Sequence, residues 1–355
     1  MSLSSGLEIE KLMELKEYDN HFRVIVLDNP KTQLKGFIAI HIKNERVPSF
    51  GATRLWKYEN ELDGLRDALR LSRLMSYKAS LAGLPCGGAK AVLLLPEHLK
   101  NREELLLSYA EAVNSLAGDF ITGTDVGLSQ DDLRLMKNSS KFFVGLNDNA
   151  TEFTALGIYY SMETCLEFLT GASDLTGKTF SVQGLGKVGH ALLSLLYPKA
   201  GKIYAADTDL EIAEKIKKEF PRVSVIKPSE IHKQQVDIFS PCALCHALNL
   251  QTVSELNCRM IVGCANNQLQ DETIGDALFK QGILYTPDYA VNVGGLIAVF
   301  DEYEHQERDD KRVQNKVAGI KKTLSDILKR SRAENRAPNR VANEITEKIL
   351  KDRVK

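Results

Sequence analysis

Short apolar runs alternate with longer amphipathic segments over the first 145 residues of the chain. Leu62, Leu65 and Leu69 recur at helical spacing within 61–82, and a second amphipathic segment spans 102–118, so both segments predict helices. Runs rich in β-branched and aromatic residues predict strands at 22–28, 35–43, 89–95 and 120–125. This pattern predicts a mixed α/β domain over residues 1–150.

The alternation becomes regular after residue 178. Short apolar runs predict strands at 178–183, 202–207, 223–226, 237–241, 259–264 and 282–287. Helical segments separate the first of these strands, as is typical of a parallel, doubly wound sheet. A long helix from Thr154 to Gly171 is expected to link this second domain, 151–325, to the first. The charged helical segment 326–355 is expected to pack back on the first domain.

Composition narrows the classes of function. The 355 residues carry 46 basic and 47 acidic side chains, so no overall field favours nucleic acid or an anionic membrane as a partner. No apolar run approaches the ~18–20 residues of a membrane span, and the first residues are too polar for a secretory signal. The six cysteines are too sparse for a disulfide scaffold, and we expect a cytoplasmic protein.

The segment SVQGLGKVGH supplies the pattern G-x-G-x-x-G as Gly184, Gly186 and Gly189. Alone the pattern is weak, because glycines often simply end strands. Here it follows a predicted strand, opens a predicted helix, and precedes Asp207, which ends the next strand 23 residues beyond Gly184. These features predict a Rossmann domain, with pyrophosphate at the helix N-terminus and ribose hydroxyls on the carboxylate. Asp207 would repel a 2′-phosphate, so NAD is favoured over NADP. The alternative interpretation of Asp207 is a turn residue that has no part in cofactor binding.

Two lysines, Lys78 and Lys90, stand in apolar or glycine-rich surroundings, whereas surface lysines are usually flanked by other charges. A desolvated lysine near another cation has a lowered pKa and can act as a general base near neutrality. The other cation can then bind a substrate carboxylate. Asp125 follows a predicted strand, where catalytic side chains commonly lie. The alternatives are exposed or snorkelling lysines and a capping aspartate.

Two further motifs are incomplete. Cys242 and Cys245 form C-x-x-C, but the next pair, Cys258 and Cys264, is spaced too widely for a zinc site, so no metal is expected. The segment GLPCGGAKA has the glycine spacing of a phosphate-binding P-loop. An alanine precedes its lysine, however, and another replaces the Ser or Thr that holds magnesium.

Seven segments resemble, in order and spacing, the glutamate/leucine/phenylalanine/valine dehydrogenases: RLMSYKASLAGLPCGGAKAV, ITGTDVG, TALGIYY, VQGLGKVG, SPCAL, GCANNQL and YTPDYAVNVGGLI. The resemblance covers residues 35–305 and is closest to the short leucine and phenylalanine dehydrogenases. It implies reversible NAD-dependent oxidative deamination of an L-amino acid to a 2-oxo acid and ammonia. It also implies a homo-oligomer, and an active site in a cleft between an N-terminal substrate domain and the Rossmann domain.

The resemblance assigns roles residue by residue. Lys78 would bind the substrate carboxylate, Lys90 would activate water for attack on the imine, and Asp125 would assist proton transfer and hold the amino group. Further substrate contacts are expected from Gly51, Gly87, Gly88, Asn266 and Asn292. The cofactor site is expected to comprise Thr154, Gly184, Gly186, Lys187, Val188, Gly189, Asp207, Cys242, Ala243 and Asn266.

The implied side-chain pocket consists of Phe50, Gly123, Leu296 and Val299. This apolar set offers no cation for the side-chain carboxylate of glutamate, so it favours a hydrophobic amino acid. In the resemblance, Gly123 and Leu296 are more typical of phenylalanine-type members. We therefore expect phenylalanine ahead of leucine, with overlapping specificity because one methylene is worth only ~1–3 kcal/mol.

The chain departs from the family pattern at Ala52, Ala89 and Cys245. The first two replace glycines and add methyl groups near the expected substrate, which is expected to tune the substrate range. Two alternative functions remain at this point: an NAD-binding regulator that has lost catalysis, and a 2-hydroxy-acid dehydrogenase. The lysines and Asp125 speak against the first, and the lack of a histidine in a comparable setting speaks against the second.

Overall fold

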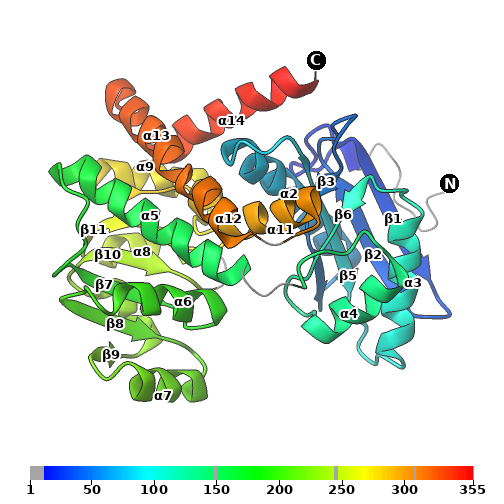
Figure 1. Ribbon diagram of the computed structural model, residues 1–355, viewed down its shortest axis with the longest axis horizontal. Helices are drawn as coiled ribbons and strands as arrows, with labels where there is room; N and C mark the ends of the chain where they lie inside the picture. Colours follow the sequence, from blue (N-terminus) through cyan, green and yellow to red (C-terminus); the bar gives the residue numbers. More distant parts are fainter. Residues whose placement is uncertain (1–11, 147–149, 244–246, 308, 355) are drawn as a thin grey trace. The chain divides into compact units, whose positions relative to one another are not determined.

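The computed structural model describes residues 12–146, 150–243, 247–307 and 309–354. Its secondary structure alternates between strands and helices in both halves of the chain (Figure 1). The chain divides into two compact units, each with its own sheet. This confirms the predicted fold class of two α/β domains, one with a mixed sheet and one with a parallel sheet.

The sheet of the first unit is mixed. Its strands are β1 (Arg23–Asn29), β2 (Leu34–Ile40), β3 (Ser49–Phe50), β4 (Thr53–Trp56), β5 (Gly87–Leu94) and β6 (Phe120–Ile121). They lie in the order β1-β2-β5-β3-β6, with β4 also paired to β5. β2 is antiparallel to β1 and β5, whereas β3 and β4 run parallel to β5. The predicted strand 120–125 ends early, because beyond Ile121 the chain forms only isolated bridges at Thr122 and Thr124 in the part that is described.

Helices of the first unit are α2 (Glu61–Leu81), α3 (Arg102–Asn114) and α4 (Gln130–Ser139). α2 starts where the Asn60 side chain accepts the backbone N–H of Asp63, which satisfies one donor of the first turn. Its apolar face, including the fully buried Leu65 and Leu69, packs on β2 and β5. Each such leucine contributes about 1.5–3 kcal/mol through burial. The helix that carries Lys78 is thereby fixed against the strand that carries Lys90.

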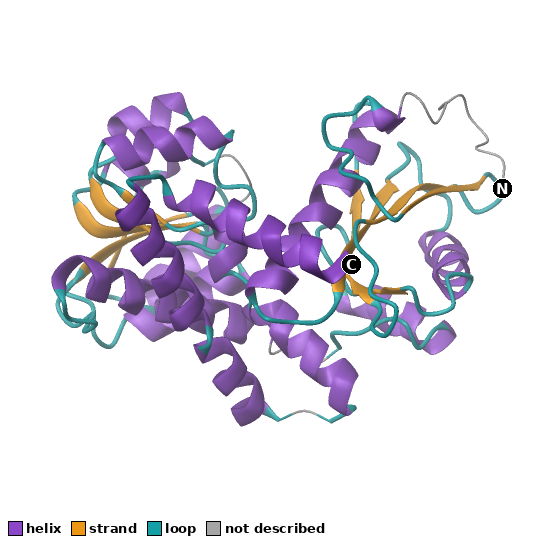
Figure 2. Cartoon of the chain, turned by 90° about the horizontal axis from the view of Figure 1, so that it is seen from above, coloured by secondary structure: helices purple, strands orange, loops and turns teal. Residues whose placement is uncertain are grey.

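The sheet of the second unit is parallel. Its strands are β7 (Thr179–Gln183), β8 (Lys202–Ala206), β9 (Val223–Val225), β10 (Val236–Pro241), β11 (Cys258–Ile261) and β12 (Leu284–Tyr285). The order is β12-β11-β10-β7-β8-β9, and helices lie on both faces of the sheet (Figure 2). The chain reverses its direction of strand addition between β7 and β10. In such sheets, ligands bind beyond the carboxyl ends of the strands at that point.

Helical elements of the second unit surround this sheet. They are α5 (Ala150–Thr170), α6 (Lys187–Leu196), α7 (Leu210–Glu219), the 3₁₀ helix η1 (Pro228–Lys233), α8 (Leu250–Glu255), α9 (Glu272–Lys280) and α10 (Asp288–Val291). The chain ends with α11 (Gly294–His305), α12 (Asp310–Ala318), α13 (Ile320–Glu334) and α14 (Pro338–Val354). Among the described residues, no helix combines the length and apolarity that a membrane crossing needs.

The C-terminal helices divide differently from the sequence expectation. Residues 307–348 group with the second unit, whereas 302–306 and 349–354 group with the first. The reason lies in local packing, because α13 buries Leu324 and Leu328 and packs on α5 of the second unit. The prediction was that segment 326–355 packs on the first domain. In this division most of that segment belongs to the second unit instead.

Candidate active site

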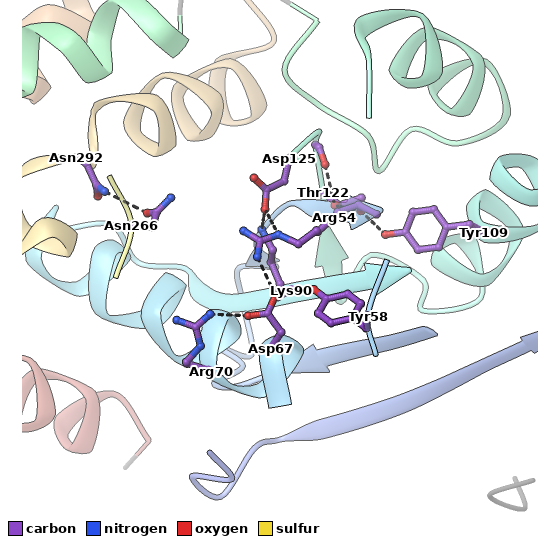
Figure 3. Close-up of polar contacts among 12 residues, drawn as sticks. Arg54, Tyr58, Asp67, Arg70, Lys90, Tyr109, Thr122, Asp125, Asn266 and Asn292 are labelled. Atoms are coloured by element: carbon purple, nitrogen blue, oxygen red, sulfur yellow. Dashed lines mark hydrogen bonds and ion pairs between the residues drawn. The ribbon is translucent and has the colours of Figure 1, made fainter. Parts of the chain in front are cut away.

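Lys90 lies in β5, with β2 on one side and β3 and β4 on the other. The strand is buried over most of its length, and Lys90 itself is only 5% exposed. Asp125 lies in the segment after β6, where its backbone N–H donates to the carbonyl of Thr53. Lys90 Nζ is 2.5 Å from Asp125 Oδ2 (Figure 3). The structure thus brings the two predicted catalytic side chains together as an ion pair.

Burial and charge act on this pair in opposite directions. Burial lowers the pKa of Lys90 by more than the neighbouring Asp125 raises it, so the pKa lies below the ordinary lysine value. Burial raises the pKa of Asp125, but the positive charges of Lys90 and Arg54 outweigh this and hold that pKa well below its usual range. Asp125 is therefore ionised at neutral pH, and Lys90 gives up its proton more readily than a surface lysine does.

A second set of polar side chains adjoins this pair, and no motif in the sequence marks it. Arg54 on β4 donates from Nε to Asp125 Oδ2 at 3.2 Å and from Nη1 to Asp67 Oδ2 at 2.8 Å. The Tyr58 hydroxyl donates to the same Asp67 oxygen at 2.6 Å, and Arg70 donates to the other at 2.5 Å (Figure 3). The only sequence signal was a charged residue inside a short, apolar strand-like run.

Lys78 is partly buried in the last turn of α2, which packs on β5. The same helix approaches the start of β5 closely, because the Gly88 backbone N–H donates to Ser76 Oγ at 2.9 Å. A Cβ at Gly88 would lie 2.0 Å from the Ser76 backbone nitrogen. Glycine is therefore required here by the protein's own packing. The substrate contacts expected of Gly51, Gly87 and Gly88 stay a prediction.

The four predicted pocket residues have different surroundings. Phe50 ends β3 and is 1% exposed, with its ring edge-on to that of Tyr303 at a centroid distance of 5.2 Å. Gly123 follows β6, and Leu296 and Val299 are partly exposed on α11. Tyr303, one helical turn beyond Val299, was not singled out from the sequence. The pocket role of the four stays a prediction.

The turn between β7 and α6 has the features that pyrophosphate binding requires. Gly184 has a φ of +94°, a left-handed conformation that favours glycine, and its N–H donates to the carbonyl of Ala206. Gly186 precedes α6 without a side-chain cap, so the helix N-terminus presents the backbone N–H groups of Lys187 and Val188. Such a terminus is suited to an anion.

Asp207 faces this turn from the end of β8. Its Oδ2 accepts the Leu185 backbone N–H at 2.7 Å, and its Oδ1 accepts that of Asp209 at 2.9 Å. A Cβ at Gly189 would lie 2.0 Å from the Gly184 carbonyl oxygen, so the turn closes tightly on the helix. The residues present therefore fit a dinucleotide, and the role of Asp207 in binding the ribose hydroxyls stays a prediction.

Asn266 and Asn292 lie together in the second unit (Figure 3). The Asn292 Nδ2 donates to Asn266 Oδ1 at 3.1 Å and to the Cys264 carbonyl at 3.0 Å. Thr154 on α5 accepts the Gly295 backbone N–H at 3.0 Å. The Asn292 bonds join the segment before α11 to the segment after β11, and the Thr154 bond joins α5 to the first turn of α11.

Cys242 follows β10, next to the glycine-rich turn. A hydrogen bond with the Cys264 side chain lowers the pKa of the Cys242 thiol in spite of its burial. A Cβ at Gly184 would lie 2.7 Å from the Ala243 backbone nitrogen, so Ala243 also adjoins the turn. Cys245, the third departure from the family pattern, lies outside the described residues. No group of three His, Cys, Asp or Glu side chains suited to a metal occurs in the described parts of the chain.

Comparison with known proteins covers most of the chain. A family model described as Glu/Leu/Phe/Val dehydrogenase, dimerisation domain, matches residues 18–142. A second, described as Glutamate/Leucine/Phenylalanine/Valine dehydrogenase, matches residues 206–350. Together the two models span both units.

Named relatives are similar over nearly their whole length. L-tryptophan dehydrogenase of Nostoc punctiforme is 40% identical over 86% of this chain and 87% of its own. Phenylalanine dehydrogenase of Thermoactinomyces intermedius is 38% identical over 91% of this chain and 90% of its own. Leucine dehydrogenase of Bacillus cereus is 33% identical over 92% of this chain and 89% of its own.

A solved structure agrees with this similarity. The crystal structure of L-tryptophan dehydrogenase from Nostoc punctiforme has a TM-score of 0.79 and 36% identity, and the match covers 94% of this chain and 96% of that one. Fold, site chemistry and sequence similarity therefore lead to one conclusion: the chain belongs to the Glu/Leu/Phe/Val dehydrogenase family and is an amino acid dehydrogenase, an oxidoreductase acting on CH–NH₂ donors.

Proposed function

We propose that the protein catalyses the reversible NAD-dependent oxidative deamination of a hydrophobic L-amino acid, with phenylalanine ahead of leucine. The products are the 2-oxo acid, ammonia and NADH. The observation that carries this proposal is the buried Lys90, whose Nζ lies 2.5 Å from the Asp125 carboxylate. A lysine with a lowered pKa beside a fixed carboxylate is suited to acid–base chemistry on an amine and on water.

Each side chain has a part in this reaction. Lys78 binds the substrate carboxylate and orients Cα. The ionised Asp125 first takes a proton from the substrate ammonium, which leaves the amine neutral for hydride transfer. A bound nicotinamide cofactor would supply the hydride acceptor, and loss of the hydride from Cα would leave a carbon–nitrogen double bond. Lys90 then takes a proton from the water that adds to the imine carbon, and Asp125 returns its proton to the nitrogen. The carbon–nitrogen bond breaks as the hydroxyl of the adduct gives up its proton, so that ammonia and the 2-oxo acid leave.

NAD is proposed as the cofactor in preference to NADP. Asp207 and Asp209 both stand where β8 ends, and Asp207 is fixed by the Leu185 backbone N–H. A carboxylate accepts hydrogen bonds from ribose hydroxyls, whereas a 2′-phosphate at the same place would meet two negative charges. A protein selective for NADP would instead need a cation here.

The preference for a hydrophobic substrate rests on Phe50, Gly123, Leu296 and Val299, none of which can bind a side-chain carboxylate. Relatives named for tryptophan, phenylalanine and leucine are 33–40% identical to this chain. These names extend the set of candidate substrates to tryptophan. We propose in addition a homo-oligomer, since the model matching residues 18–142 is described as a dimerisation domain.

NADH formation, followed by its absorbance across a panel of L-amino acids and 2-hydroxy acids, tests the proposal. Phenylalanine, leucine, tryptophan and glutamate should be compared by kcat/KM with NAD⁺ and with NADP⁺. We expect phenylalanine to give the highest value, glutamate to be inactive, and NAD⁺ to be preferred. Activity with hydroxy acids alone, or a preference for glutamate, would reject the assignment.

A further inference from the structure

Two cations converge on a single oxygen of Asp125. Lys90 Nζ lies 2.5 Å from Oδ2, and Arg54 Nε lies 3.2 Å from the same atom. Both donors come from neighbouring strands, β5 and β4, so they approach the carboxylate from the sheet (Figure 3). Both bonds therefore end on Oδ2, and neither cation bonds the other oxygen, Oδ1.

Arg54 is itself held in place from α2. Its Nη1 donates to Asp67 Oδ2 at 2.8 Å, and Tyr58 donates to that oxygen at 2.6 Å. Arg70 binds the opposite oxygen of Asp67 at 2.5 Å. The side chains of Arg54 and Asp67 are 20% and 12% exposed, so water screens their charges only partly. A guanidinium can bridge two carboxylates in this way because its donors have a fixed, planar geometry.

We propose that Arg54 is a positioning residue: clamped by Asp67, it orients the Asp125 carboxylate so that Oδ2 holds Lys90 while Oδ1 is presented to the amino group of the substrate. This inference rests on the proposed roles of Lys90 and Asp125. It assigns a function to Arg54, which no sequence motif marks. It also gives a reason for the contacts of Asp67 with Arg54 and Tyr58 beside the site.

Electrostatics gives this role a signature that a structural role lacks. The charged groups around Lys90 are Asp125 after β6, Arg54 on β4 and Asp67 on α2, and after burial the charge of Asp125 is the strongest influence on the pKa of Lys90. Asp125 raises that pKa, whereas Arg54 lowers it. Removal of Arg54 therefore raises the pKa of Lys90. Because Lys90 must be neutral to act as a base, the acid limb of the pH profile of kcat/KM then moves to higher pH.

Arg54→Met tests the proposal, with Arg70→Met as its matched control. Both variants remove an arginine bonded to Asp67, but only Arg54 also bonds Asp125. In Arg54→Met, Asp67 keeps Tyr58 and Arg70 as partners, so it is not left unpaired. We expect Arg54→Met to lower kcat by about 10–100-fold, as a misplaced catalytic group does, with little change in KM.

The pH profile and a rescue variant complete the test. Arg54→Met should move the acid limb to higher pH, and Arg70→Met should leave it in place. Arg54→Lys should restore the position of the limb more fully than it restores kcat, because lysine supplies the positive charge but lacks the planar, forked donors of a guanidinium. If Arg54→Met does not fold, Asp67→Asn, which loosens the clamp, should lower kcat in the same way with a smaller effect.

Wild-type kcat and an unmoved limb in Arg54→Met, or equal effects in Arg54→Met and Arg70→Met, would overturn the inference. Lys90→Met separates this failure from failure of the proposed function. An inactive Lys90→Met beside a normal Arg54→Met rejects the inference alone, whereas an active Lys90→Met rejects the proposed mechanism.

Discussion

Replacement of Asp125 by asparagine isolates the charge of the ion pair, because the two side chains have nearly the same shape. Two unit charges 2.5 Å apart attract by about 2 kcal/mol in water and about 7 kcal/mol at an effective dielectric constant of 20. Since 1.36 kcal/mol corresponds to about one unit of pKa, loss of the carboxylate should lower the pKa of Lys90 by at least about one unit. Burial and Arg54 then lower the pKa, and only the weaker charge of Asp67 still raises it.

The assay is the pH dependence of kcat/KM for the preferred amino acid at saturating NAD⁺. Asp125→Asn should move the acid limb by at least about one pH unit to lower pH and reduce turnover on the plateau by about 10²–10⁴-fold. The direction is opposite to that expected for Arg54→Met, so general damage to the fold cannot produce both. NADH binding, measured by fluorescence, should be retained. An unmoved limb, or one moved to higher pH, would refute the reasoning.

Three further predictions concern the rest of the chain. Lys78→Ala should raise KM for the amino acid by about 10–100-fold with a smaller change in kcat, since a hydrogen bond to a charged group contributes about 1.5–3 kcal/mol; an unchanged KM would exclude it from carboxylate binding. Asp207→Ala should weaken NAD⁺ binding by a similar factor. It should also narrow the difference in kcat/KM between NAD⁺ and NADP⁺, as kinetics with both cofactors would show. Burial lowers the pKa of His21 from 6.5 to about 4, so below pH 6.5 the unfolded state binds the proton first and stability falls by about 3 kcal/mol as the pH drops to 4. His21→Gln should flatten this part of the stability curve in urea titrations, and an equal slope in both proteins would contradict the assignment.

The Rossmann unit was predictable because its signals are contiguous in sequence. The strand before Gly184, the helix after Gly186 and Asp207 at the end of the next strand all lie within 30 residues. The strands β7 and β8 begin and end within one residue of the prediction. The mixed sheet was predicted less completely. β3 has two residues, and β6 stops at Ile121, because the chain there forms isolated bridges that leave no pattern in the sequence.

The interior of the candidate site was harder to predict. Lys90 and Asp125 were singled out individually, but their pairing depends on β5 meeting the segment after β6, 35 residues later in the chain. Arg54 and Asp67 were not predicted, because their contact joins a strand to a helix. The sequence marks Arg54 only as a charged residue in a short strand-like run, and it has no local pattern for Asp67. Gly88 shows the reverse case: the glycine was expected to make room for substrate, whereas the structure also requires it for the approach of α2 to β5.

Lys90→Met tests the central claim most directly, because methionine keeps most of the length of the side chain and removes its amino group. The measurement is kcat for oxidative deamination of phenylalanine, beside NADH affinity by fluorescence. The account predicts that NADH affinity stays near the wild-type value while kcat falls by about 10²–10⁴-fold, the usual contribution of a general base. A variant with near-wild-type kcat would contradict it.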